Sequence, residues 1–227
     1  MSIHSGFGCI GKLEYILAAL HARSVFLVTG KSSFESILAV SNLSKILSHY
    51  KTVRFCDFSV NPHVEDIEKG RVLLNQSDCD VTLAIGGGSV LDMAKSVNLL
   101  AGQEGSVLDY LSNKKSISPC KRPLIAVPTT AGSGSEATSF AVVYVEKIKY
   151  SLSHQFMLPD EVILDAALTL SLTPYITAST GMDALSQAIE SYWSIHATAE
   201  SSAYAIEAIL LILKNLVAAV NHPTPTS

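Results

Sequence analysis

"DVTLAIGGGSVLDMAKSVNLL", residues 80–100, decides the fold that we expect for this chain. An apolar, β-branched run at 81–85 is followed by Gly86, Gly87 and Gly88, and a helical pattern begins at about Val90. Glycines let a ligand approach the backbone closely, and a helix N-terminus carries partial positive charge. The stretch therefore predicts a strand, a turn suited to phosphate oxygens and a helix. An ordinary tight turn between strand and helix is the alternative.

Three polar side chains follow the glycine turn. Ser89 is the expected helix cap and adds a hydroxyl group to the turn, while Asp92 and Lys95 lie on the next helical turns. The latter two side chains either hydrogen-bond a ligand or pair with each other. Because the spacing matches neither GxGxxG nor the P-loop pattern, the glycines alone do not identify the ligand.

Strands and helices alternate around this stretch. We expect strands at 24–30, 52–59, 123–128 and 160–165, a hairpin at 141–155, and helices at 34–50 and 63–76. The second of these helices follows a break at Asn61–Pro62, and Ser33 is the expected cap of the first. Alternation at this spacing predicts an α/β fold, a Rossmann-like parallel sheet with helices on both faces.

The pattern becomes helical after residue 165, with helices expected at about 182–194 and 200–220. We therefore divide the chain into a dinucleotide-binding α/β domain (1–165) and the beginning of an all-helical domain (166–227). A lobe of two helices leaves much apolar surface exposed, and the chain ends soon after this part begins. We expect a C-terminally truncated chain in which the helical metal and substrate domain is incomplete.

A second polar loop strengthens the interpretation of the glycine turn. "VPTTAGSGSE" (127–136) places the hydroxyl groups of Thr129, Thr130, Ser133 and Ser135 at the carboxyl end of a neighbouring strand. Ligands of open parallel sheets bind at this edge. Two such loops suit a dinucleotide, one for the pyrophosphate and the other for a ribose or the nicotinamide. A solvated Ser/Thr loop is the alternative.

Composition excludes several classes of partner. The 227 residues are 48% hydrophobic and 16% charged, and a net charge of −4 argues against a general nucleic-acid binder. The N-terminus lacks the charged and apolar regions of a signal peptide. The apolar stretch 205–220 is interrupted by Glu207, Lys214 and Asn215 and is shorter than the about 20 residues of a membrane span. We expect a buried amphipathic helix there and no membrane contact.

The four cysteines, Cys9, Cys56, Cys79 and Cys120, are scattered and form no CxxC pair. This spacing is typical neither of a zinc site nor of a secreted disulfide framework. We expect a cytoplasmic protein.

Five stretches, in the family's order, make the chain resemble the iron-containing (group III) alcohol dehydrogenases. They are "FGCIGKL", "IGGGSVLDMAK", "PLIAVPTTAGSGSEAT", "LPDEVILDAALTLSLTP" and "TGMDALSQAIESYWS". Within the family the chain is most similar to the phosphonoacetaldehyde reductase branch. The resemblance implies a dehydroquinate synthase-like architecture, in which a Rossmann-like domain precedes an all-helical domain. It also implies NAD(P)H-dependent interconversion of a small aldehyde and a primary alcohol, here phosphonoacetaldehyde and 2-hydroxyethylphosphonate, and a homodimer for a full-length protein.

The resemblance also implies roles for individual residues. The turn from Gly86 to Ser89 cradles the pyrophosphate, and Asp92 matches an acidic residue close to the nicotinamide. The remaining matched contacts on the nicotinamide side are Thr129, Thr130, Ser133 and Lys149. Phe140 stands where some members have an asparagine, so that contact is not carried over.

Cofactor choice is expected to depend on Gly30, Lys31 and Ser32. Members that prefer NAD often have an aspartate after the first strand, which accepts a hydrogen bond from the adenosine ribose. Here that position is Gly30, so no carboxylate repels a 2′-phosphate, and Lys31 can pair with it. We expect a preference for NADP(H) over NAD(H). A solvated lysine with no such role is the alternative.

The family's metal site is only half present. The helix containing "TGMDALSQAIES" (180–191) supplies Asp183, which matches a metal ligand, but Gln187 stands where the family has a histidine. An amide oxygen is a poorer ligand for iron or zinc than imidazole. Weak metal binding, a hydrogen bond from Gln187 to the substrate in place of the metal, and drift in an inactive copy all remain open. The histidines downstream, His196 and His222, are expected on the surface.

Two other functions compete with the aldehyde reductase. One is a catalytically inactive remnant that at most binds the nucleotide. The other is the lyase chemistry of the dehydroquinate synthase-like relatives, which use a nucleotide and a metal. The motifs favour the dehydrogenase, although they do not identify a catalytic acid or base.

Overall fold

The computed structural model describes residues 1–119 and 122–224, so Cys120 lies outside the described residues. The chain separates into two compact units. The first consists of Met1–Thr129 and Ser135–Asp165, and the second of Thr130–Gly134 and Ala166–Ser227.

The first unit contains a parallel sheet with the strand order β1-β8-β5-β4-β2-β3 among the described residues. Its strands are β1 (Ser2–Ser5), β2 (Ser24–Thr29), β3 (Lys51–Phe55), β4 (Val81–Gly86), β5 (Leu124–Pro128) and β8 (Glu161–Leu164). Every residue of β2, β4 and β5 is buried. Central parallel strands are covered on both faces, which explains their nearly continuous apolar sequences. The parallel α/β fold predicted from the sequence is confirmed.

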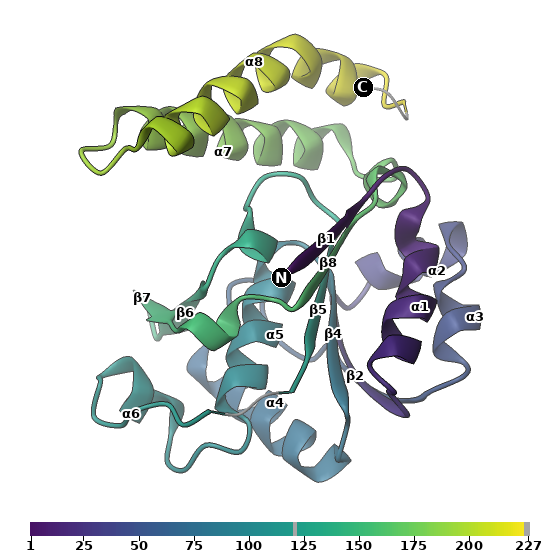
Figure 1. Cartoon of the computed structure of the whole chain (residues 1–227), viewed down its shortest axis with the longest axis vertical. Coiled ribbons are helices and arrows are strands. Elements are labelled where there is room, and N and C mark those ends of the chain that lie inside the picture. The colour runs from purple at the N-terminus through teal and green to yellow at the C-terminus, as the bar shows by residue number, and fades with distance from the viewer. Residues whose placement is uncertain (120–121, 225–227) are drawn as a thin grey trace. The chain divides into compact units, whose positions relative to one another are not determined.

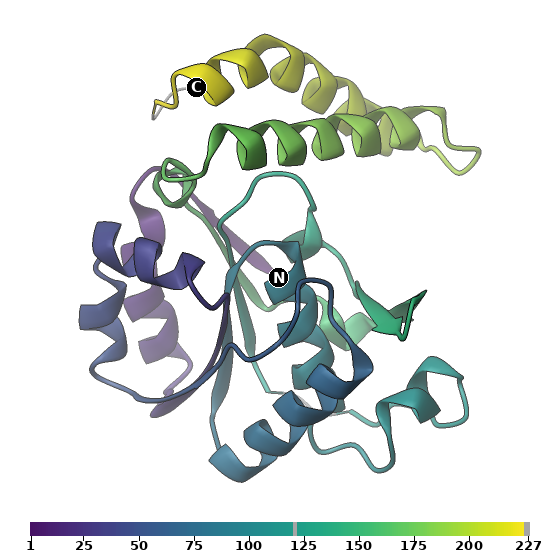
Figure 2. The same ribbon diagram turned by 180° about the vertical axis from the view of Figure 1, so that it is seen from behind.

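Helices cover both faces of this sheet (Figures 1 and 2). The first face carries α1 (Lys12–Ala19), α2 (Ser33–Val40) and α3 (Leu43–Leu47), and the second carries α4 (Val64–Ser77) and α5 (Gly88–Leu100). A short helix, α6 (Val107–Leu111), follows α5. The antiparallel hairpin of β6 (Phe140–Val145) and β7 (Ile148–Ser153) lies beyond α5. The hairpin was predicted correctly.

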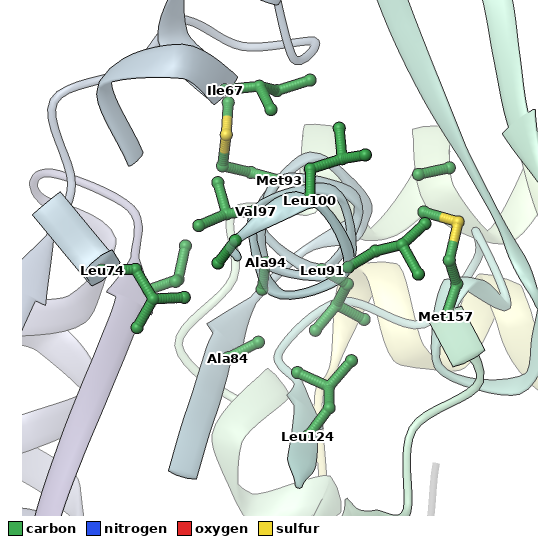
Figure 3. Packing of buried hydrophobic residues seen from close by; sticks show 14 of the residues in the cluster. Ile67, Leu74, Ala84, Leu91, Met93, Ala94, Val97, Leu100, Leu124 and Met157 are labelled. Atoms are coloured by element: carbon green, nitrogen blue, oxygen red, sulfur yellow. The ribbon is translucent and has the colours of Figure 1, made fainter. Parts of the chain in front are cut away.

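The core of this unit surrounds α5. Figure 3 shows Leu91, Met93, Ala94, Val97 and Leu100 of this helix among apolar side chains of its neighbours, which include Ile67, Leu74, Ala84, Leu124 and Met157. Met93, Ala94 and Val97 are fully buried. Because α5 is enclosed by α4, the sheet and the β6–β7 hairpin, its N-terminus has a fixed position at the end of β4.

In the first unit, a predicted helix, a predicted strand and a predicted cap differ from the structure. The helix expected at 34–50 is two helices, because Ser41 is extended (φ −134°, ψ 165°) and its hydroxyl donates to the carbonyl of Ile37 at 2.6 Å. Side chains of this kind compete with helical hydrogen bonds. The strand expected at 52–59 ends at Phe55, and the cap of α2 is Ser32 rather than Ser33. The elements β1, α1 and α6 were not anticipated.

The second unit contains α7 (Pro174–Trp193) and α8 (Ala199–Asn221). Pro174 occupies the first turn of α7, and the hydroxyl of Thr173 caps it, so this helix begins earlier than the expected residue 182. The two helices approach closely at Gly181, where an added Cβ would lie 2.3 Å from Leu216 Cδ1.

Residues 205–220 form a helix, as predicted, but the prediction that this helix is buried was wrong. The segment lies in α8 and is helical, but Leu210, Leu213 and Val217 are 63%, 65% and 71% exposed. This helix is long and apolar enough to cross a membrane by length and composition alone, which is weak evidence for a span.

Candidate functional site

The strand order creates a topological switch point between β2 and β4. The chain passes from β2 outward to β3 and then returns to place β4 on the opposite side of β2. Thr29 pairs with Ile85, so the chain leaves these two neighbouring strands at adjacent positions, Gly30 and Gly86. In open α/β sheets, ligands bind outside the carboxyl ends of the strands at such a point. Two of the predicted cofactor loops therefore flank the expected binding crevice.

The glycine turn joins β4 to α5 without a side-chain cap from any described residue. Gly87 is the N-cap, and the first helical residue is Gly88. The prediction that Ser89 caps the helix was wrong; its hydroxyl instead accepts the backbone N–H of Asn61 at 3.2 Å. The N-terminal amides of α5 are thus not bonded to a capping side chain, which is the donor set that an anionic oxygen requires.

Gly86 is needed for close packing of strand and helix. A Cβ atom added there would lie 2.5–2.9 Å from the Cγ2, Cβ and Cγ1 atoms of Val90. Since a branched side chain in the first turn of a buried helix has little freedom to move, any larger residue at position 86 would displace the start of α5.

The predicted nicotinamide-side residues are divided between the two units. Thr129 is buried, and its N–H donates to the carbonyl of Gly86 at 3.0 Å, which joins the ends of β5 and β4. Thr130 and Ser133 belong to the second unit. Lys149 is exposed on β7, opposite Tyr144 of β6 in the hairpin register.

Asp92 and Lys95 pair with each other, the second of the two alternatives considered from the sequence. Lys95 Nζ lies 3.7 Å from Asp92 Oδ1, and the lysine side chain is 1% exposed. Burial lowers the pKa of Lys95, and the nearby Asp92 carboxylate opposes this effect. The side chain of Asp92 is 13% exposed and accepts the backbone N–H of Val142 at 2.9 Å.

The turn after β2 contacts two charged side chains that sequence reasoning missed, Asp57 and Arg54. Lys31 Nζ forms an exposed ion pair with Asp57 Oδ1 at 2.9 Å, and a hydrogen bond from Lys31 lowers the pKa of Asp57. Arg54 of β3 donates to the carbonyls of Gly30 and Lys31, both at 3.1 Å. The available signal was an arginine between the apolar Val53 and Phe55 of β3, since a partly buried side chain of this kind must reach polar partners at the strand end.

Asp183 and Gln187 lie one turn apart on α7, and both are exposed. Gln187 Nε2 donates to the carbonyl of Gly132 at 3.3 Å, and Gly132 lies in the same unit. His196 and His222 are exposed, as predicted.

Comparison with protein families identifies the fold and these motifs. The model described as "Iron-containing alcohol dehydrogenase" matches residues 1–166, and "Fe-containing alcohol dehydrogenase family, C-terminal" matches residues 177–226. The chain belongs to the iron-containing alcohol dehydrogenase family.

Curated relatives and solved structures agree with the family assignment. The chain is 34% identical to long-chain-alcohol dehydrogenase 1 of Geobacillus thermodenitrificans over 96% of this chain and 56% of the relative. It is 44% identical to the probable alcohol dehydrogenase EutG of Escherichia coli over 71% of this chain and 41% of the relative. Sulfoacetaldehyde reductase of Bifidobacterium kashiwanohense in complex with NAD⁺ is similar with a TM-score of 0.92 and 34% identity, over 98% of this chain and 60% of that chain. The chain therefore spans about half the length of the curated relatives it matches.

The metal that the family name implies does not fit the described residues. Among them, no three His, Cys, Asp or Glu side chains lie close enough together to hold a metal ion. Asp183 and Gln187 provide one carboxylate and one amide, whereas iron and zinc sites require further nitrogen, sulfur or oxygen ligands. The nucleotide of this family, in contrast, fits the glycine turn and the amides of α5.

Proposed function

We propose that the chain binds a nicotinamide dinucleotide across the carboxyl ends of β2, β4 and β5. The observation that carries the proposal is the N-terminus of α5, which no described side chain caps, beside the switch point between β2 and β4. Residues 1–165 form the nucleotide-binding domain in this proposal, and 166–227 begin a helical metal and substrate domain. A larger protein of this kind interconverts an aldehyde and a primary alcohol, as a homodimer in the cytoplasm.

Each loop contributes differently to binding. The amides of Gly88 and Ser89 donate to the pyrophosphate, because they open α5 and carry its partial positive charge. Thr129 orients the nicotinamide side together with Thr130, Ser133 and Lys149, and Asp92 holds the segment beside them. The bound nicotinamide supplies or accepts the hydride.

Cofactor preference is part of the proposal. Gly30 removes a carboxylate from the ribose position, and Lys31 supplies a positive charge, so we expect NADP(H) to bind more tightly than NAD(H). The pairing of Lys31 with Asp57 opposes this preference. Similar proteins whose names specify a cofactor include an NAD⁺ complex and an NAD-dependent methanol dehydrogenase of Bacillus methanolicus. The preference for NADP(H) therefore rests on Gly30 and Lys31 alone.

The substrate class that we propose is a small aldehyde with an anionic group, and phosphonoacetaldehyde is the specific candidate. The support is the family resemblance together with the sulfoacetaldehyde named for a solved relative. Both aldehydes carry an acidic group.

The incomplete metal donor set favours a second candidate, a chain that binds the nucleotide but does not turn over. The test measures NADPH and NADH binding by fluorescence titration, and then their oxidation at 340 nm with phosphonoacetaldehyde and uncharged aldehydes, with and without Fe²⁺ or Zn²⁺. Turnover with the anionic aldehyde supports the reductase. Nucleotide binding without turnover under all these conditions supports the inactive remnant, and absence of binding contradicts both.

A further inference from the structure

Lys95 is a buried cation whose three N–H groups are all used. Its Nζ atom donates to Ser135 Oγ at 3.0 Å, to Thr138 Oγ1 at 2.8 Å and to the carbonyl of Phe140 at 2.7 Å. An ammonium group has three donors and no acceptor, so these bonds satisfy it completely. All three partners lie in one short segment, residues 135–140.

Asp92, one turn earlier on α5, also binds Ser135 and in addition Val142, the third residue of β6. Its Oδ1 atom accepts the hydroxyl of Ser135, and its Oδ2 atom accepts the backbone N–H of Val142 at 2.9 Å. The two charges lie 3.7 Å apart with little solvent access. A buried ion pair adds little net stability compared with well-packed apolar residues. In this chain its effect is geometric, because both charges hydrogen-bond to residues between 135 and 142.

The segment held in this way leads into the β6–β7 hairpin. Residues 140–142 open β6, and its partner β7 carries Lys149. The hairpin is also anchored at Tyr144, whose N–H donates to the carbonyl of Pro62 at 2.7 Å. The helix whose N-terminus faces the proposed pyrophosphate position thus also fixes the hairpin through Asp92 and Lys95.

We infer that Lys95 is a positioning residue that, with Asp92, sets the hairpin for the nicotinamide half of the cofactor. The inference rests on the proposed function and adds a role for a residue that does not itself touch the ligand. It predicts that substitutions in the hydrogen-bond network of Asp92 and Lys95 with residues 135–142 reduce the contribution of the nicotinamide to the binding affinity. Recognition of the adenosine and pyrophosphate should be retained, because the turn from Gly86 to Ser89 lies outside the network.

The experiment compares the dissociation constants of NADH and ADP-ribose for the full chain by titration calorimetry. ADP-ribose lacks only the nicotinamide, so the dissociation constant of ADP-ribose divided by that of NADH measures the nicotinamide contribution. Lys95→Met removes the ammonium, and Thr138→Val removes one of its acceptors with little change of shape. Thr82→Val is the matched control. The Thr82 hydroxyl donates at 2.7 Å to Asn98, which follows Lys95 by one turn of α5, and neither residue takes part in the described hydrogen bonds of Asp92 and Lys95 to residues 135–142.

We expect the ratio to fall roughly threefold to tenfold in Thr138→Val, the effect of about one hydrogen bond, and further in Lys95→Met. Affinity for ADP-ribose should stay within about twofold of wild type in all variants, and Thr82→Val should keep the wild-type ratio. If Lys95→Met does not fold, the ratio measured for Thr138→Val tests the inference. An unchanged ratio in the folded network variants, or an equal fall in the control, overturns the inference. Failure of the wild-type chain to bind either ligand overturns the proposed function instead.

Discussion

Gly86 is the residue at which strand, turn and helix of the candidate site meet. Gly86→Ala places a methyl group within 2.5–2.9 Å of the Val90 side chain, so the first turn of α5 must move. We expect a loss of about 1–3 kcal/mol in the free energy of unfolding, as for overpacked cores. We also expect NADH affinity to fall by roughly tenfold or more, since the displaced amides no longer face the pyrophosphate.

Urea unfolding and NADH titration of the same Gly86→Ala preparation measure both effects. Gly134→Ala is a useful contrast, because no atom lies within 4 Å of its added Cβ and the cost comes from its positive φ of 61°. Wild-type NADH affinity in a folded Gly86→Ala protein would show that the turn does not contact the nucleotide.

The Lys31–Asp57 pair should control the choice between NADPH and NADH. Asp57→Asn frees Lys31 and removes a negative charge, so the affinity for NADPH relative to NADH should rise by roughly twofold to fivefold, as exposed ion pairs are weak. Lys31→Ala should lower the same ratio. Titrations at low and high salt provide the check, because exposed charge effects diminish with ionic strength. A ratio that does not change in Lys31→Ala would remove the basis for NADP(H) preference.

At the scale of elements, Asp80 joins the beginnings of β2 and β4. Its Oδ2 atom accepts the N–H groups of Arg23 and Ser24 at 2.8 and 3.0 Å. The N–H of Arg23 is the main cause that holds the Asp80 pKa below its ordinary value of 3.8. A lowered carboxyl pKa stabilises the fold above that ordinary value, and the stabilisation is lost as the pH falls through the lowered pKa.

Asp80→Asn should therefore lower the free energy of unfolding by about 1 kcal/mol at pH 7. The difference in the free energy of unfolding between the variant and wild type should become smaller as the pH falls below 3.8, because the wild-type carboxylate is then progressively protonated. Chemical unfolding of both proteins between pH 7 and pH values below 3.8 measures this difference. Asp78→Asn is the control: Asp78 has positive φ, which asparagine tolerates, and its side chain makes no described ion pair. A difference that is independent of pH would contradict the role given to the Asp80 carboxylate.

The elements most accessible to sequence reasoning are those with one dominant signal. Residues 81–85 and 124–128 are continuous apolar runs bounded by turns, and both proved to be central parallel strands. The edge strand β1 was missed because Ser2–Ser5 has no apolar run, and its place in the sheet depends on its distant pairing with β8. The break at Ser41 was missed because the periodicity continues across it.

The candidate site was predictable in its loops and not in its contacts. Gly86–Ser89 and Thr129 were predicted at strand ends from their residue types, and the structure places them at the ends of β4 and β5. From the sequence, it stayed open whether Asp92 and Lys95 pair. No pattern in the sequence indicated that Ser135, Thr138 and Phe140 accept hydrogen bonds from Lys95. These contacts are made between segments about 40 residues apart, and packing rather than local propensity selects them.

At the scale of the whole molecule, one stripe of α8 carries exposed apolar side chains, Leu210, Leu213 and Val217. Exposed apolar surface of this kind promotes association. We expect the chain to self-associate with rising concentration, and the double change Leu213→Lys and Val217→Lys to shift sedimentation velocity profiles toward the monomer. Val72→Lys, at a 54% exposed position of α4, is the control and should leave the profile unchanged. A wild-type chain that stays monomeric at every concentration would contradict this expectation.

The central claim is that the chain binds a nicotinamide dinucleotide at the carboxyl ends of β2, β4 and β5. The most direct measurement is a titration of the purified chain into NADPH and NADH, followed by the fluorescence of the reduced nicotinamide, with circular dichroism on the same sample to establish folding. We predict saturable binding of both nucleotides, tighter for NADPH, and its loss in Gly86→Ala. A folded chain that shows no saturable change with either nucleotide would contradict the account.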